Sequence, residues 1–416
     1  MNISTAFAPP FKLVAPFFIL GVITFLISIL LMFGVELKTL HYLNSSTLAW
    51  VHIFLLSFVM LIILGAMAQL VPVVLEVGHC AVDLYYAIYP LIVVGTILMA
   101  FGFYTLPVLL PFGGTAIFIA MAIFLIETFL TILKVKKINF IISTIIISNI
   151  FLLLGLIIGI ALALNHAGIV SLDSFRLLKS HIFLVFFGYV GTTIMSMSLI
   201  LLPMFWLSHS FSWIYVKSAF YILCSSIISM LIFSFFNINI FETISYTLCI
   251  ISLLLYFVQI FVIYKKRVRV EVDIYFKSMI FSYLSLIVSL ILFIAYFYYG
   301  KDNLLISASW LIFVGFIGFL IAGHLYKIVP FLVWYERFSM FVGKKQVPML
   351  TDLIPKKSSN FQILISSLGT TIVTIGLATN ISEIYKSGLC FLTIGLIFLL
   401  KDILYMATIK EESYVF

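Results

Sequence analysis

Charged residues are scarce in this chain. Only 9% of its 416 residues are Asp, Glu, Lys or Arg, whereas about a quarter of the residues in a soluble domain are charged. Hydrophobic residues make up 64% of the chain, and the mean hydropathy is +1.29. A water-soluble globular protein is therefore excluded.

Several enzyme motifs are absent from the sequence. It contains no HExxH pair of zinc ligands, which argues against a zinc peptidase, and no GxSxG turn. It also has no GxxxxGK[ST] loop to hold a nucleotide, so an ATP-driven pump would need another subunit. The sequence assigns no catalytic residue.

Cysteines are few and scattered. The four are Cys80, Cys224, Cys249 and Cys390, and no CxxC motif is present. Scattered cysteines of this kind are read as buried or loop thiols without a zinc or redox role.

The net charge of +8 does not indicate nucleic-acid binding, because the basic residues lie in short loops between apolar runs. In such loops Lys and Arg orient a membrane protein in its bilayer. The predicted partners are the lipid bilayer and a redox partner or another membrane subunit, with no nucleic acid.

Long apolar runs dominate what remains. A membrane-spanning helix needs about 20 apolar residues, and the chain contains twelve runs of this kind. We predict an all-α polytopic membrane protein with spans near 12–34, 46–76, 84–104, 107–133, 138–164, 178–206, 216–237, 243–264, 274–298, 304–331, 360–379 and 386–407.

The distribution of Lys and Arg predicts the orientation. If both termini are cytoplasmic, the outer side keeps only Lys38, Arg176, Lys179, Lys301 and Lys386, and the cytoplasmic side receives the other 18 of the 23 basic residues. This asymmetry is the one expected of an inserted helical protein. The inner (plasma) membrane is the default compartment.

Three segments resemble one another, at residues 50–79, 179–209 and 309–337. Each ends near a proline (Pro72, Pro203 and Pro330), and the first two begin with the same His-Ile-Phe tripeptide. They fall on the second, sixth and tenth spans. We therefore predict one transmembrane domain, 1–416, made of three pseudo-repeated groups of four helices at roughly 12–134, 138–264 and 274–407.

Two histidines stand at matched depth in this pattern. His52 and His181 are each predicted one to two turns below the outer surface, and an ionisable side chain inside a membrane is a functional candidate. Two imidazoles on facing helices can ligate a haem iron. Gly188, seven residues after His181, would let a flat ring approach the backbone.

Other interpretations of the histidines stay open. A histidine near a helix end commonly bonds a loop carbonyl or a lipid headgroup and has no further role. His79 and His209 follow their prolines and are expected to be solvated at the cytoplasmic surface.

Glu127 is predicted to be the only carboxylate well inside a span. His324 lies near Lys327 in the cytoplasmic third of the tenth span and could form a polar cluster with Glu127. Such clusters serve as proton relays in membrane transport, although a snorkelling lysine would also explain the polar residues.

Twelve spans in groups of four, with His52 near the outer start of the second span, resemble subunit I of the haem–copper oxidases. The NnrS family of twelve-span proteins is similar in length and in this pattern. The resemblance is carried by the runs from His52 to Pro72, from His181 to Pro203 and from Gly323 to Pro330.

The resemblance implies an axial haem ligand at His52 and a copper-binding residue at His181. The chain departs from the oxidases on its seventh span, 216–237, which has no histidine, and on the outer part of its tenth span, which has Trp310 where the family has histidines. A complete copper site is therefore improbable, and His52 and His181 become an alternative axial pair.

The leading hypothesis is a membrane protein that binds haem b for electron transfer or for nitric oxide or metal handling. His52 and His181 are the predicted iron ligands, with His324 as a third cofactor-binding residue. The rival hypothesis is a proton-coupled permease without a cofactor, in which Glu127 and His324 form the proton relay. A structural or assembly subunit is a third alternative.

Overall fold

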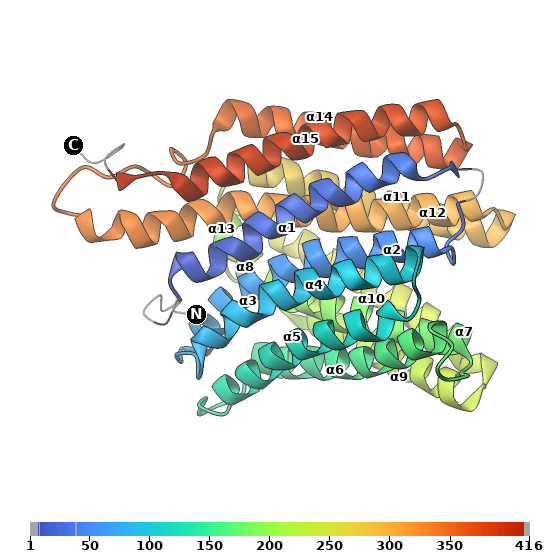
Figure 1. The fold of residues 1–416 in the computed structure, drawn as a ribbon. Coiled ribbons are helices and arrows are strands. Elements are labelled where there is room, and N and C mark those ends of the chain that lie inside the picture. Colours follow the sequence, from blue (N-terminus) through green and yellow to red (C-terminus); the bar gives the residue numbers. More distant parts are fainter. Residues whose placement is uncertain (1–6, 8, 38–39, 412–416) are drawn as a thin grey trace. The chain divides into compact units, whose positions relative to one another are not determined.

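The computed structural model describes residues 7, 9–37 and 40–411 (Figure 1). Throughout these residues the regular elements are helices, and no β-strand is formed. Lys38, which the sequence places on the outer side, lies outside the described residues.

Twelve helical segments are long and apolar enough to cross a membrane, as predicted. They are Phe11–Gly34, Ser45–Leu75, Val82–Tyr104, Leu109–Ile132, Phe140–His166, Ser174–Trp206, Ile214–Phe236, Asn239–Lys265, Ile274–Tyr299, Asp302–Arg337, Lys356–Thr379 and Ser382–Thr408. A helix pairs its backbone groups internally, which is what the hydrocarbon interior requires. The protein is therefore a multi-pass integral membrane protein; its orientation stays a prediction.

Three of these spans have the same interrupted construction. A short α-helix is followed by a π-helical segment and then by a second α-helix. The three sets are α2 (Ser45–His52), η4 (Ile53–Met60) and α3 (Leu61–Leu75); α7 (Ser174–Ile182), η6 (Phe183–Gly191) and α8 (Thr192–Trp206); and α12 (Asp302–Trp310), η7 (Leu311–Gly318) and α13 (Phe319–Arg337). π-Helical turns are rare in proteins as a whole, and those that occur are often found at functional sites.

The chain divides into two compact units. The first unit comprises Val74–Leu84 and Pro107–Glu271 and contains α5 (Leu109–Ile132), α6 (Phe140–His166), α7, η6, α8, α9 (Ile214–Phe236) and α10 (Asn239–Lys265). The second unit comprises the described residues of Ser4–Val73, Tyr85–Leu106 and Val272–Phe416. The three predicted four-helix groups divide the chain differently and stay a prediction.

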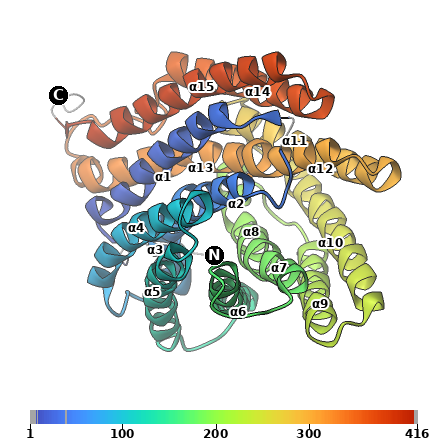
Figure 2. The same cartoon turned by 45° about the vertical axis from the view of Figure 1, so that its right-hand side comes forward.

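In the first unit, small polar residues join neighbouring helices. α9 and α10 lie side by side (Figure 2), and Ser226 and Ser245 each donate a hydrogen bond to the other's backbone carbonyl at 2.7 Å.

On α6, Phe151 fills the space beside Gly188, where an added Cβ would lie 2.9 Å from the Phe151 Cβ. The prediction that Gly188 leaves room for a flat ring is therefore wrong, because a side chain of α6 already occupies that room.

The second unit contains α1 (Phe11–Leu31), α2, η4, most of α3, α4 (Tyr85–Tyr104), α11 (Ile274–Tyr299), α12, η7, α13, α14 (Lys356–Thr379) and α15 (Ser382–Thr408). α14 and α15 form a close antiparallel pair, and α1 runs along α15 (Figure 1). Trp50 stacks on Trp310 with ring centroids 5.9 Å apart, and Tyr385 donates to the carbonyl of Met32 at 2.9 Å.

Candidate functional site

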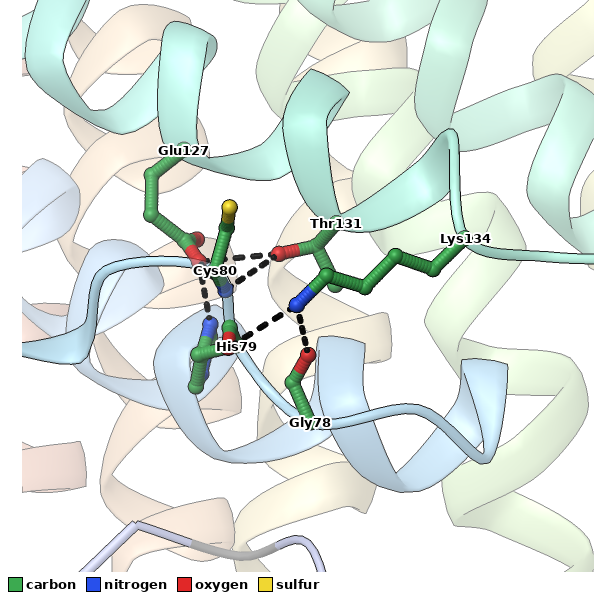
Figure 3. A network of polar contacts seen from close by, with 6 residues as sticks. All are labelled: Gly78, His79, Cys80, Glu127, Thr131 and Lys134. Atoms are coloured by element: carbon green, nitrogen blue, oxygen red, sulfur yellow. Dashed lines mark hydrogen bonds and ion pairs between the residues drawn. The ribbon is translucent and has the colours of Figure 1, made fainter.

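A buried carboxylate–imidazole pair joins α5 to the segment that follows α3 (Figure 3). The Glu127 side chain on α5 is fully buried, and its Oε1 is 2.8 Å from Nδ1 of His79. The His79 side chain is 4% exposed. The expectation that His79 is solvated is therefore wrong: it is buried against Glu127. His209, by contrast, is exposed as expected.

Three donors converge on the same oxygen of Glu127. Besides His79 Nδ1, the backbone N–H of Cys80 donates to Oε1 at 3.0 Å and the Thr131 hydroxyl donates at 2.8 Å (Figure 3). Thr131 lies one helical turn after Glu127, so α5 presents both side chains on one face. Hydrogen bonds to a charged acceptor are about twice as strong as neutral ones. The arrangement can hold a carboxylate away from water, and it places a protonatable ring beside it.

The segment that carries His79 is held by the end of α5. Glu76, directly after α3, has a left-handed backbone (φ 55°) that ends the helix. Lys134, just past the end of α5, donates from Nζ to the carbonyls of Gly78 at 3.1 Å and His79 at 3.2 Å (Figure 3). The lysine and Glu127 together fix the position of the imidazole, which lies 48 residues from Glu127 along the chain.

The His181 side chain packs against α6 in the first unit. Its Nδ1 lies 2.9 Å from the carbonyl oxygen of Gly155 on α6, so Nδ1 carries the proton because a carbonyl only accepts. The ring lies against Gly159, where an added Cβ would approach His181 Cε1 to 2.8 Å. Together with Phe151 beside Gly188, these contacts tie α7 and η6 to α6. The role of His181 as an iron ligand stays a prediction.

His52 ends α2 in the second unit, directly before the π-helical segment η4. Its Nδ1 is 2.7 Å from the carbonyl of Leu48, and the Phe103 ring lies beside it at a centroid distance of 5.0 Å. Nδ1 therefore carries the proton and Nε2 bears the lone pair. Histidines that ligate metals are commonly oriented in this way, by a backbone carbonyl on the second ring nitrogen.

His324 belongs to the second unit, whereas Glu127 belongs to the first. The Nδ1 of His324 bonds the carbonyl of Leu320 at 2.7 Å, and the Tyr275 hydroxyl lies 3.4 Å from Nε2. Lys327 pairs with Asp273 at 2.6 Å. The partner of Glu127 in the structure is His79, and a proton relay that includes His324 stays a prediction.

A second carboxylate is also fully buried inside a span. Asp402 on α15 has an exposure of 0%, so the expectation that Glu127 is the only such carboxylate is wrong. Asp402 lies within the predicted span 386–407, but the sequence does not show which face of the helix it occupies. In the structure α15 continues to Thr408, and Asp402 faces inward while Lys401 is exposed.

Comparison with known proteins assigns no family to the chain. No protein-family model matches it, and no curated protein sequence matches it. Among the described residues, no three His, Cys, Asp or Glu side chains come together to hold a metal ion. The resemblance to haem–copper oxidases and to NnrS proteins therefore rests on the spans and histidines of the sequence.

Proposed function

We propose that this multi-pass membrane protein is a proton-coupled secondary transporter and that Glu127 and His79 are its coupling pair. The observation that carries the proposal is the buried pair itself, with Oε1 and Nδ1 2.8 Å apart. Ionisable groups inside a membrane are energetically costly and typically mark ion or proton pathways. A proton bound by this pair changes its charge from net negative to neutral, or from neutral to positive, in a site shielded from water.

The interrupted spans support the same proposal. Transporters use broken spanning helices at which backbone hydrogen bonding can change. The three α–π–α spans provide such interruptions, and a proline lies in the last segment of each, at Pro72, Pro203 and Pro330. Their common construction also supports the predicted threefold repeat.

The transport proposal predicts solute-dependent proton flux. In proteoliposomes containing the pH dye pyranine, one class of solute among amino acids, dicarboxylates, sugars and divalent cations should drive proton movement. Glu127→Gln should abolish this flux because the amide cannot bind the coupled proton, and His79→Gln should reduce it. Glu242→Gln is the matched control, because Glu242 pairs with Lys179 in the same unit and is one-quarter exposed. Equal flux in Glu127→Gln and the unaltered protein would refute the coupling role.

A second candidate function, haem b binding for electron transfer or for nitric oxide or metal handling, is favoured by His52. Its ring has the carbonyl-bound Nδ1 typical of a ligating histidine and lies at the start of a π-helical segment. A bound haem would supply one-electron chemistry at its iron. In this proposal His52 would contribute Nε2 as an axial ligand, and a redox partner would be required.

The absorption spectrum of the purified protein distinguishes the haem-binding proposal from the transporter proposal. For a haem protein, the dithionite-reduced minus oxidised spectrum of the purified protein should show a b-type band, with about one haem per chain expected for one axial-ligand pair by the pyridine haemochrome assay. The band should disappear in His52→Ala and persist in His79→Ala. A flat spectrum after expression with ample haem would exclude this candidate and leave the transporter proposal.

A further inference from the structure

The second unit contains a path of hydrogen-bonded polar side chains that begins at an open pocket. The pocket, of about 500 Å³, is lined by residues of the loop before α14 and by the first turn of that helix, among them Lys356, Lys357 and Ser358. The Ser358 hydroxyl donates a hydrogen bond to Asp402 Oδ1 at 2.5 Å. The fully buried carboxylate is therefore one side chain away from the pocket.

The polar path continues from Asp402 to side chains of α13 and α14. The Tyr326 hydroxyl on α13 donates to Asp402 Oδ2 at 2.8 Å and lies 3.4 Å from Gln362 Oε1 on α14. The Gln362 amide then donates to the Ser366 hydroxyl at 3.0 Å. Three helices, α13, α14 and α15, thus supply one connected polar path.

This path ends at a small cavity. Gln362 and Ser366 both line a cavity of about 10 Å³, together with Phe25, Gly318 and Leu396. Such a volume is near the minimum for one water molecule. Gly318 is the last residue of the π-helical segment η7, so the path leads from the pocket to one of the three interrupted helices.

In the part of the chain that the structure describes, Asp402 forms no ion pair, and the charge of Lys401 acts on it only from a distance. Lys401, the preceding residue, is exposed, and its ammonium lies 5.4 Å from the centre of the Phe398 ring. Lys356 and Lys357 are exposed at the pocket. The remaining charged groups on the helices packed against α15 are Lys12 on α1, which is exposed; Lys327 on α13, which pairs with Asp273; Glu336, which accepts from the backbone N–H of Phe11; and Arg337, which donates to the carbonyls of Ala407 and Ile409.

A buried carboxylate without a cation carries a large energetic penalty when it is ionised. The hydroxyls of Ser358 and Tyr326 reduce the penalty but bring no positive charge. Binding one proton removes the charge entirely, and the resulting acid can donate to either hydroxyl oxygen. The geometry therefore favours a proton as the ligand of Asp402.

We propose that Asp402 is a proton-binding site that is loaded from the pocket through Ser358. A hydronium ion at the pocket gives its proton to the Ser358 oxygen while the Ser358 hydroxyl proton passes to Asp402 Oδ1. The products are water and a neutral carboxylic acid, and no bond other than O–H changes. The proposal concerns a different unit from the Glu127–His79 pair and does not depend on it.

Infrared spectroscopy of the purified full-length protein tests the site without any substrate. The protein at neutral pH should show the C=O stretching band of a protonated carboxylic acid, and Asp402→Asn should lose this band. Asp273→Asn is the matched control and should keep it, because Asp273 is ion-paired with Lys327 at 2.6 Å. Tyr326→Phe keeps the carboxyl group and should shift the band, because one hydrogen bond to it is lost, so the test does not depend on the folding of Asp402→Asn.

The route is tested by hydrogen–deuterium exchange of the same band. Ser358→Ala should keep the band but slow its shift in D₂O, whereas Ser359→Ala should exchange as the unaltered protein does, since Ser359 bonds the carbonyl of Lys356 instead. A band that persists in Asp402→Asn and is unmoved in Tyr326→Phe would overturn the proposal. So would a carboxylate that is ionised in sodium buffer and protonated only in choline buffer, because the site would then hold Na⁺. A transporter assay without solute-driven flux would leave these results unaffected.

Discussion

Replacing His79 with alanine is expected to destabilise the protein more than replacing Glu127 with glutamine. The first change leaves the fully buried Glu127 carboxylate without its imidazole partner. Removing a hydrogen-bond partner of a buried group typically costs about 1–3 kcal/mol of stability, and more when the group left behind is charged. Glu127→Gln keeps the shape of the side chain and removes its charge, so we expect this variant to lose less stability than His79→Ala.

A double-mutant cycle measures the interaction directly. The His79→Ala, Glu127→Gln double variant should be more stable than His79→Ala alone, because no buried carboxylate is then left without its imidazole. Thermal unfolding in detergent gives the four stabilities. Glu242→Gln serves as the control, and its loss should stay within about 1 kcal/mol because pairs with solvent access contribute little. Equal unfolding temperatures for His79→Ala and the unaltered protein would contradict the prediction.

Substituting Gly376 with valine is expected to disrupt the pairing of α14 with α15. A Cβ at Gly376 would lie 2.4 Å from the backbone N of Tyr385 and 2.6 Å from its Cα. Gly369 and Gly388 make similar approaches, at 2.4 Å to Leu392 N and 2.5 Å to Val373 N. Small residues allow spanning helices to approach to backbone contact in a membrane.

The helices have to separate to admit the valine, because the atoms it meets belong to the backbone. Tyr385 is also held in place by its hydrogen bond to the Met32 carbonyl. Overpacking a core costs about 1–3 kcal/mol, and more where the neighbours cannot move. Gly376→Val should therefore lower both the unfolding temperature and the yield of folded protein.

Gly114→Ala is the matched control for this prediction. The nearest atoms to a Cβ at Gly114 on α5 are 3.9 Å away, at Ala163 and Ile160, which is ordinary contact. Alanine is favoured over glycine in a helix by about 0.5–1 kcal/mol, so this variant should be as stable as the unaltered protein or slightly more so. A Gly376→Val protein that unfolds at the same temperature as Gly114→Ala would show that the close packing of α14 and α15 is unimportant for stability.

The number and positions of the membrane spans could be predicted from the sequence alone. The predicted ranges 84–104 and 274–298 correspond to Val82–Tyr104 and Ile274–Tyr299 in the structure. The largest difference is at the end of the tenth span, where the helix continues from the predicted residue 331 to Arg337. Hydropathy marks the apolar part of a helix, whereas the polar turns at its end are held by contacts such as those of Arg337 with Ala407 and Ile409.

The candidate sites were only partly predictable. A carboxylate in an apolar run is conspicuous, so the sequence identifies Glu127, but it offers His324 as a partner, whereas the structure pairs Glu127 with His79. Nothing in the spacing of two residues 48 positions apart tells whether a loop returns to the helix. Asp402 and Lys401 are adjacent in the predicted span 386–407, and only their burial in the structure shows that Asp402 points inward while Lys401 points outward.

The sequence by itself determined that the chain is a helical membrane protein and where it crosses, because each apolar run must satisfy its own backbone in lipid. The tertiary structure decided which polar side chains meet. The pairing of Glu127 with His79, the filling of Gly188 by Phe151 and the link from Ser358 through Asp402 to Tyr326 all join separate helices. Such contacts depend on the rotation and depth of each helix against its neighbours, and hydrophobic patterning leaves both undetermined.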